Sequence, residues 1–206
     1  MSSVRARLVI LHAVFLLSGF AAIIYQLIWQ RALLTSYGAN SETVTVVVAA
    51  FMLGLGAGSL AGGELSQRSR WSLPALFAAM ELGIAVCGVA SLPVFAAVSR
   101  WTLTVSPVVS AVTVFLLLLV PTALMGATLP MLVAYTARYS AAVGRAVGSL
   151  YSINALGSAL GAGAAIVIVF SSLGQQRSVW LAASLNIVIA LVAGSVAKWG
   201  GEGVAS

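Results

Sequence analysis

Six long apolar stretches occupy nearly the whole of this chain and limit its fold more than any other feature. They cover about residues 8–30, 43–65, 72–98, 105–136, 141–170 and 179–196. Only 7% of the residues are charged and the mean hydropathy is +1.10, whereas a globular domain carries about a quarter charged residues. An apolar run of roughly 20 residues matches the thickness of the bilayer hydrocarbon. The sequence therefore predicts a polytopic membrane protein.

The fold class follows from what lipid demands of the backbone. Backbone polar groups must be satisfied within each segment, so continuous apolar runs are expected to form helices. A closed barrel would need short strands of alternating hydrophobicity instead. We expect an all-α, six-helix transmembrane domain over residues 1–198, followed by a flexible cytoplasmic tail over residues 199–206.

Basic residues are divided unevenly between the two ends of the predicted bundle. Loops rich in arginine and lysine remain in the cytoplasm, so we expect both termini on the cytoplasmic side of a bacterial-type inner membrane. The net charge of +6 does not predict a nucleic-acid partner, because a nucleic-acid face would be a soluble basic patch with interleaved aromatic residues. Seven basic residues fall on the side of the termini (Arg5, Arg7, Arg68, Arg70, Arg138, Arg145 and Lys198), and three on the other (Arg31, Arg100 and Arg177).

Two of the apolar stretches carry glycines at helical spacing. Small residues four positions apart let helices approach closely in lipid, where packing drives association. We expect these glycines at helix-packing interfaces, either within the chain or, alternatively, in a dimer or a sliding contact. They are Gly54, Gly58 and Gly62 in the second stretch, and Gly144, Gly148, Gly157 and Gly161 in the fifth.

Tryptophans lie at or near the ends of the predicted spans. Amphipathic rings of this kind form an aromatic belt where the bilayer meets water. The sequence therefore predicts interfacial positions for Trp29, Trp71, Trp101, Trp180 and Trp199.

Glu81 is the sharpest candidate for a functional group. It lies about nine residues into the third stretch, which places it well inside the hydrocarbon at 1.5 Å per residue. An ionisable group at that depth is costly and is by default a functional candidate facing the bundle interior. We consider a proton-coupling site or a counter-ion for a cationic substrate. The structural alternative pairs Glu81 with Arg145 or with a polar group such as Asn154.

Four other polar residues complete the hypothetical site for substrate binding or proton coupling. Arg145 lies just inside the fifth stretch, where it could instead extend its charge to the interface. Asn154 lies in the middle of the same stretch and could instead bond across helices. Gln26 and Arg31 belong to a polar cluster at the outer end of the first stretch, and interfacial anchoring is the alternative for both.

No pattern of catalytic or metal-binding residues is present. The single cysteine, Cys87, excludes a disulfide framework, and the lone His12 has no companion ligands for a metal. The chain has no aspartate for a Ser-His-Asp set, and its glycines lie in apolar helices rather than in a phosphate-binding loop. We therefore expect no enzymatic activity, no cofactor and no metal.

Ordered motifs over most of the chain resemble one membrane family. Residues 18–26 read SGFAAIIYQ, residues 49–59 AAFMLGLGAGS, residues 81–83 ELG, residues 121–130 PTALMGATLP and residues 148–161 GSLYSINALGSALG. This series resembles the membrane half of spermidine-synthase-like proteins, which join a major-facilitator-like half to a synthase. Members of that family continue into a domain resembling aminopropyltransferases, and this sequence carries none of its catalytic residues.

The resemblance implies half of a major facilitator fold, which would act as a dimer or with a partner. Together with Glu81, it favours a non-catalytic membrane module that binds or moves a small, cationic metabolite. The alternative is an accessory or anchoring subunit of a larger membrane protein complex, docked through its glycine-rich faces.

Overall fold

The computed structural model describes residues 2–38, 41–102, 104–139 and 142–201. Nearly all of these residues are helical. In chain order the elements are α1 (Ser2–Tyr37), α2 (Ser41–Arg68), α3 (Leu73–Thr102), α4 (Pro107–Ala137), α5 (Val143–Ala164), the π-helical turn η1 (Ala165–Val169), α6 (Phe170–Ser172) and α7 (Gly174–Gly201).

Six of these helices are long and apolar enough to cross a membrane, which confirms the predicted all-α, six-helix fold. The chain is therefore a multi-pass membrane protein. The helices extend beyond the apolar stretches until a local signal ends them. Gly38 follows α1 with a φ of 91°, a left-handed conformation that favours glycine. Ser106 caps α4 by accepting a hydrogen bond from the backbone N–H of Val109, and Pro107 occupies the first turn.

The C-terminal helix is longer than the apolar pattern indicates. Because α7 continues through Gly201, the helical domain extends past the predicted limit at residue 198. Residues 202–206, the greater part of the predicted flexible tail, lie outside the described residues.

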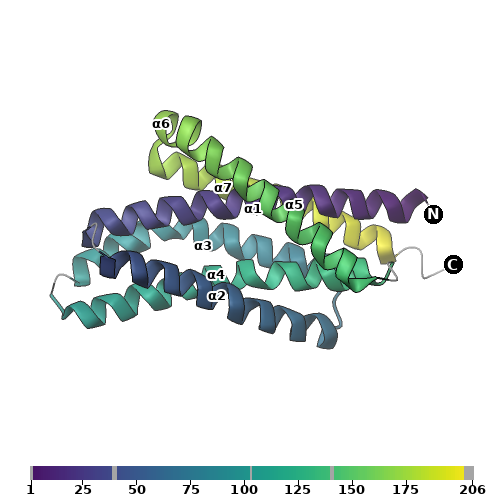
Figure 1. Cartoon of the computed structure of the whole chain (residues 1–206), viewed down its shortest axis with the longest axis horizontal. Coiled ribbons are helices and arrows are strands. Elements are labelled where there is room, and N and C mark those ends of the chain that lie inside the picture. The colour runs from purple at the N-terminus through teal and green to yellow at the C-terminus, as the bar shows by residue number, and fades with distance from the viewer. Residues whose placement is uncertain (1, 39–40, 103, 140–141, 202–206) are drawn as a thin grey trace.

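The helices run along one long axis (Figure 1). The start of α1 and the end of α7 lie at the same end of the bundle, which we call the terminal end. The distal end is the opposite one, where α1 meets α2, α3 meets α4 and α6 meets α7. The main packing partners are α4 for α2, α4 and α7 for α3, and α5 and α7 for α1.

The parallel pair of α1 and α3 has a constant register. Three side-chain hydrogen bonds join the two helices, namely Ser18 to Glu81, Trp29 to Ser91 and Tyr37 to Thr102. Their sequence separations are 63, 62 and 65 residues, so equivalent levels of the two helices stay side by side along the bundle.

Glycines set the closest helix contacts. A Cβ at Gly58 would overlap the backbone of Ala123 in α4, and a Cβ at Gly157 would overlap the Leu16 carbonyl in α1. Five of the seven predicted packing glycines meet a neighbouring helix of the chain in this way: Gly54, Gly58 and Gly62 on α4, and Gly157 and Gly161 on α1.

The other two predicted packing glycines have a different environment. A Cβ at Gly144 or Gly148 would meet no atom of the described residues within 4 Å. Both residues therefore face away from the rest of the described bundle.

The tryptophans separate into two groups. Trp71, Trp101 and Trp180 are exposed near helix ends, as the belt pattern indicates. The prediction was wrong for Trp29, which is completely buried. The reason is that α1 continues to Tyr37, so Trp29 lies inside the bundle rather than at its surface. The side chain of Trp199 lies outside the described residues.

Candidate functional site

A polar layer crosses the bundle between two buried apolar clusters. The distal cluster includes Ile24, Ile84 and Ala182, and the terminal cluster includes Phe15 and Ala78. On α1, α3 and α7 the two clusters are therefore separated by a short interval. Polar side chains occupy that interval on all three helices: Ser18 on α1, Glu81 on α3 and Asn186 on α7.

Glu81 is at the centre of this layer and is completely buried. Ser18 Oγ donates a hydrogen bond of 2.6 Å to Glu81 Oε1, and Asn186 Nδ2 donates one of 2.5 Å to Glu81 Oε2. Each carboxyl oxygen thus has a partner from a different helix, as a buried polar group requires. The Glu81 side chain ties α3 to both α1 and α7.

No cation of the described residues compensates Glu81. Among the described residues, an ion pair joins Glu64 and Arg68, and it lies at the terminal end of α2, away from Glu81. Buried charges in proteins are normally paired, so a carboxyl group held only by neutral donors is unusual. The structural alternative expected a partner such as Arg145 or a polar group such as Asn154; Glu81 is bonded to polar groups, but these are Ser18 and Asn186.

A cavity of about 250 Å³ adjoins the polar layer, and all six spanning helices contribute to its wall, although Glu81 itself is not among the lining residues. We call it the central cavity. Both hydrogen-bond partners of Glu81 line it. Its polar lining residues are Ser18, Ser59, Thr128, Tyr151, Asn154 and Asn186.

Asn186 has an unused acceptor in this cavity wall. Its Nδ2 is bonded to Glu81, but its Oδ1 is buried and has no hydrogen-bond partner among the described residues. A buried polar atom without a partner costs about 1–3 kcal/mol.

The central cavity reaches the surface of the bundle between α2 and α5. Two of its lining residues, Ser59 of α2 and Tyr151 of α5, are exposed, with Tyr151 at 64%. The rim of the cavity thus carries hydroxyl groups on a surface that would otherwise face lipid.

An aromatic layer lies on the distal side of the cavity. Trp29 stacks on Tyr25 at 5.1 Å between ring centroids and contacts Phe51 and Phe95 at 6.1 and 6.2 Å. Its Nε1 donates a hydrogen bond of 2.9 Å to Ser91 Oγ. Tyr25 and Trp29 are completely buried and come about two and three turns after Ser18 on α1. They form part of the packed core between the central cavity and the distal end.

The predicted site residues do not all come together. Asn154 lines the central cavity, and its Nδ2 donates to the backbone carbonyl of Phe15 at 3.2 Å, which also gives it a role in packing α5 on α1. Arg145 is exposed in the first turn of α5. Gln26 is partly buried and Arg31 is exposed on the distal part of α1, and neither is among the residues that line the central cavity.

Two residues of the polar layer were missed from the sequence. Asn186 interrupts the apolar run of α7 at mid-span, so the argument that identified Glu81 could also have identified it. Ser18 gave no comparable signal, because a serine in an apolar helix can satisfy its hydroxyl on its own backbone.

The described residues contain no group of three or more His, Cys, Asp or Glu side chains that could hold a metal ion. The arrangement suits binding, because the wall of the central cavity holds both hydrogen-bond partners of a buried carboxyl group. No protein-family model, curated protein or solved structure matches the chain. The resemblance to the spermidine-synthase-like family therefore stays a prediction.

Proposed function

We propose that this chain is a non-catalytic membrane module that binds or moves a small cationic metabolite, with Glu81 as the counter-ion. The observation that carries the proposal is the fully buried Glu81, whose two neutral hydrogen-bond partners both line the central cavity. A cation in that cavity would supply the charge that the described residues do not provide. Attraction between the two would be strong, because the apolar surroundings screen charges poorly.

The hydrogen bonds of the cavity wall favour a donor ligand. Ser18 uses its proton on Glu81, and Thr128 Oγ1 uses its proton on the Met125 carbonyl at 2.7 Å. Their oxygens are left as acceptors. A volume of about 250 Å³ lies just below the range of about 300–1,000 Å³ typical of drug-sized ligand pockets, so the ligand would be small.

Movement of a ligand would require a second set of helices. Alternating access generally rocks one bundle against another around a midplane site. The face between α2 and α5 is suited to such a contact, because the cavity rim lies there and Gly63 and Gly148 meet no described atom within 4 Å of an added Cβ. We assign this face to a second copy of the chain. The excess of basic residues at the terminal end supports a cytoplasmic position for both termini in a bacterial-type inner membrane.

Uptake by purified protein in proteoliposomes tests this function. Labelled methylammonium, ethanolamine and butylammonium would serve as probes, with Glu81→Gln as the test variant. The wild type is expected to accumulate at least one of them, and the variant to lose that uptake while eluting as the same monodisperse species. The loss is expected because the amide has the shape of the carboxylate but no negative charge.

Glu64→Gln is the matched control, because Glu64 is an exposed acid at the terminal end of α2. It should leave uptake unchanged. Equal uptake by wild type and Glu81→Gln would remove Glu81 from the mechanism. The proposed function would be contradicted if the wild type neither binds nor accumulates any of the three probes.

The exposed glycines favour one alternative, an accessory or anchoring subunit of a larger membrane protein complex. Gly144 and Gly148 offer α5 as a close-packing surface for a foreign helix. Purification in a mild detergent followed by mass spectrometry separates the two functions. A stoichiometric large partner supports the subunit, and a homodimer without other proteins supports the binding or transport module.

A further inference from the structure

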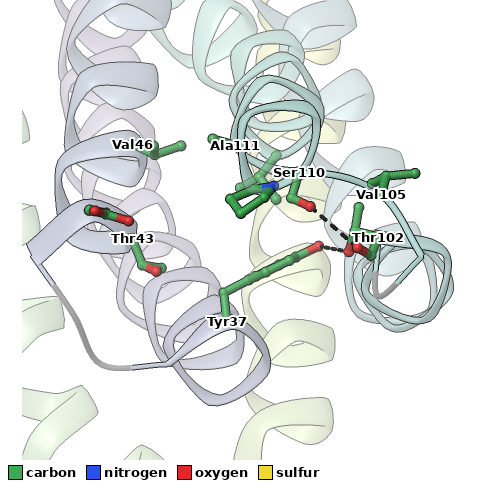
Figure 2. Close-up of a pocket in the computed structure, with 10 residues that line it drawn as sticks. Tyr37, Thr43, Val46, Thr102, Val105, Ser110 and Ala111 are labelled. Atoms are coloured by element: carbon green, nitrogen blue, oxygen red, sulfur yellow. Dashed lines mark hydrogen bonds between the residues drawn. The ribbon is translucent and has the colours of Figure 1, made fainter.

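A second, larger pocket of about 360 Å³ lies at the distal end of the bundle. We call it the distal pocket. It is formed by the ends of α1 and α3 and the beginnings of α2 and α4, with Tyr37, Thr43, Thr102 and Ser110 among its polar lining residues (Figure 2). None of these residues lines the central cavity. The aromatic layer around Trp29 comes between the two sites along α1.

The hydroxyl groups of this pocket have their protons committed elsewhere. Thr102 Oγ1 donates to the Ser99 carbonyl at 3.0 Å, so in its bond of 2.9 Å with Tyr37 the tyrosine hydroxyl is the donor. Ser110 Oγ donates to the backbone carbonyls of Ser106 and Thr102 at 3.2 and 3.4 Å. Figure 2 shows the two contacts at Thr102. The oxygens of Tyr37, Thr102 and Ser110 therefore keep lone pairs but have no proton to offer.

The distal pocket also carries a negative charge, which suits the same kind of ligand as its acceptor oxygens do. Glu42, in the first turn of α2, lines it, and no cation of the described residues forms an ion pair with this carboxylate. The basic residues of the distal end, Arg31, Arg100 and Arg177, are not among its lining residues. A ligand would meet one negative charge and several acceptor oxygens.

The rest of the wall is apolar. Val46, Pro107, Ala111 and Val114 face the same space, and Figure 2 shows Val46 and Ala111 across the pocket from Tyr37. A fully hydrated inorganic cation would gain nothing from such a surface. An organic cation with a hydrocarbon body would bury apolar area there and place its charged end near Glu42.

We infer that the distal pocket binds a small primary ammonium with an apolar body. Glu42 supplies the counter-charge, and the oxygens of Tyr37, Thr102 and Ser110 accept the ammonium N–H bonds. The inference goes beyond the proposed function, because binding here requires neither Glu81 nor movement across the membrane. It defines a capture site on the distal side of the aromatic layer, separate from the central cavity.

Titration calorimetry on the purified full chain in detergent tests the inference. Three probes separate the contributions of positive charge, N–H donors and apolar body to binding. 2-Phenylethylammonium has all three. Its N,N,N-trimethyl derivative lacks the N–H donors, and 2-phenylethanol lacks the positive charge. The wild type is expected to bind the first in a saturable manner and the other two more weakly. Glu42→Gln should weaken the binding of 2-phenylethylammonium about fivefold, the upper range for an exposed ion pair, and leave 2-phenylethanol unchanged.

Two further variants make the test decisive. Ala111→Leu would fill the pocket and should remove saturable binding, whereas Glu64→Gln should bind like the wild type. Absence of saturable binding to the wild type, or equal affinity of the wild type and Glu42→Gln, would overturn the inference. Glu81→Gln separates it from the proposed function: the variant should keep the distal binding even where its uptake is lost.

Discussion

The central cavity and the distal pocket each combine an acid with acceptor oxygens, but they are built in opposite ways. Glu81 is completely buried, and all six spanning helices contribute to the wall of the central cavity. Glu42 is exposed, and its pocket is formed by helix ends. In the central cavity, the residues that would bind a ligand therefore also hold the helices together. At the distal end, Tyr37 and Thr102 likewise join α1 to α3, whereas the exposed Glu42 can change without disturbing the bundle.

The largest expected effect compares added volume at the two sites. Gly126 lines the central cavity and packs against the backbone of Leu55, so a side chain there must push α4 away from α2. We expect Gly126→Leu to destabilise the protein by about 3 kcal/mol, the upper range for overpacking. Ala111→Leu extends into the distal pocket and should change stability by about 0.5 kcal/mol at most. Reversible unfolding in mixed micelles with increasing denaturing detergent measures both.

Gly163→Leu is the control for the loss of a glycine as such. A Cβ at Gly163 meets no described atom within 4 Å, so this variant should unfold like the wild type. Equal stability of Gly126→Leu and Gly163→Leu would show that the close approach of α2 and α4 is not required, and the contrast between the two sites would lose its basis.

A smaller effect compares hydrogen bonds of the two sites. Asn186→Leu removes the donor to Glu81 Oε2 and leaves a buried polar atom without its partner, at a cost of about 1–3 kcal/mol. Tyr37→Phe removes one hydrogen bond to Thr102 in a partly buried position, and we expect a loss of about 0.5–1.5 kcal/mol. The same unfolding measurement applies to both variants.

The double variant Glu81→Leu with Asn186→Leu isolates the cause. Replacing both partners of a buried hydrogen bond by apolar groups is often nearly neutral, so the double variant should recover much of the stability that Asn186→Leu loses. Additive losses in the double variant would mean that Asn186 stabilises the bundle through packing rather than through Glu81.

The same contrast explains what the sequence could predict. The six helices follow from hydrophobic length, and Glu81 follows from the cost of an acid at mid-membrane. Its partners depend on which helices meet and in what register, so Arg145 was considered while Ser18 and Asn186 were overlooked. Glycine spacing likewise indicates that a helix face packs closely but not against what. Gly58 packs within the chain, whereas Gly148, on an equally regular stripe, faces outward.

The smallest expected effect concerns salt, and it distinguishes the two acids without any mutation. The Debye length falls from about 30 Å at 0.01 M to about 3 Å at 1 M ionic strength, and screening acts on exposed charges far more than on buried ones. Binding of 2-phenylethylammonium near the exposed Glu42 should therefore weaken about threefold to fivefold over that range, as expected for an exposed pair of this strength. Uptake governed by the buried Glu81 should keep its affinity for the labelled amine in the same salt series. Equal salt sensitivity of the two measurements would indicate that a single, solvent-accessible site accounts for both, and the separation of a distal capture site from a central counter-ion would have to be abandoned.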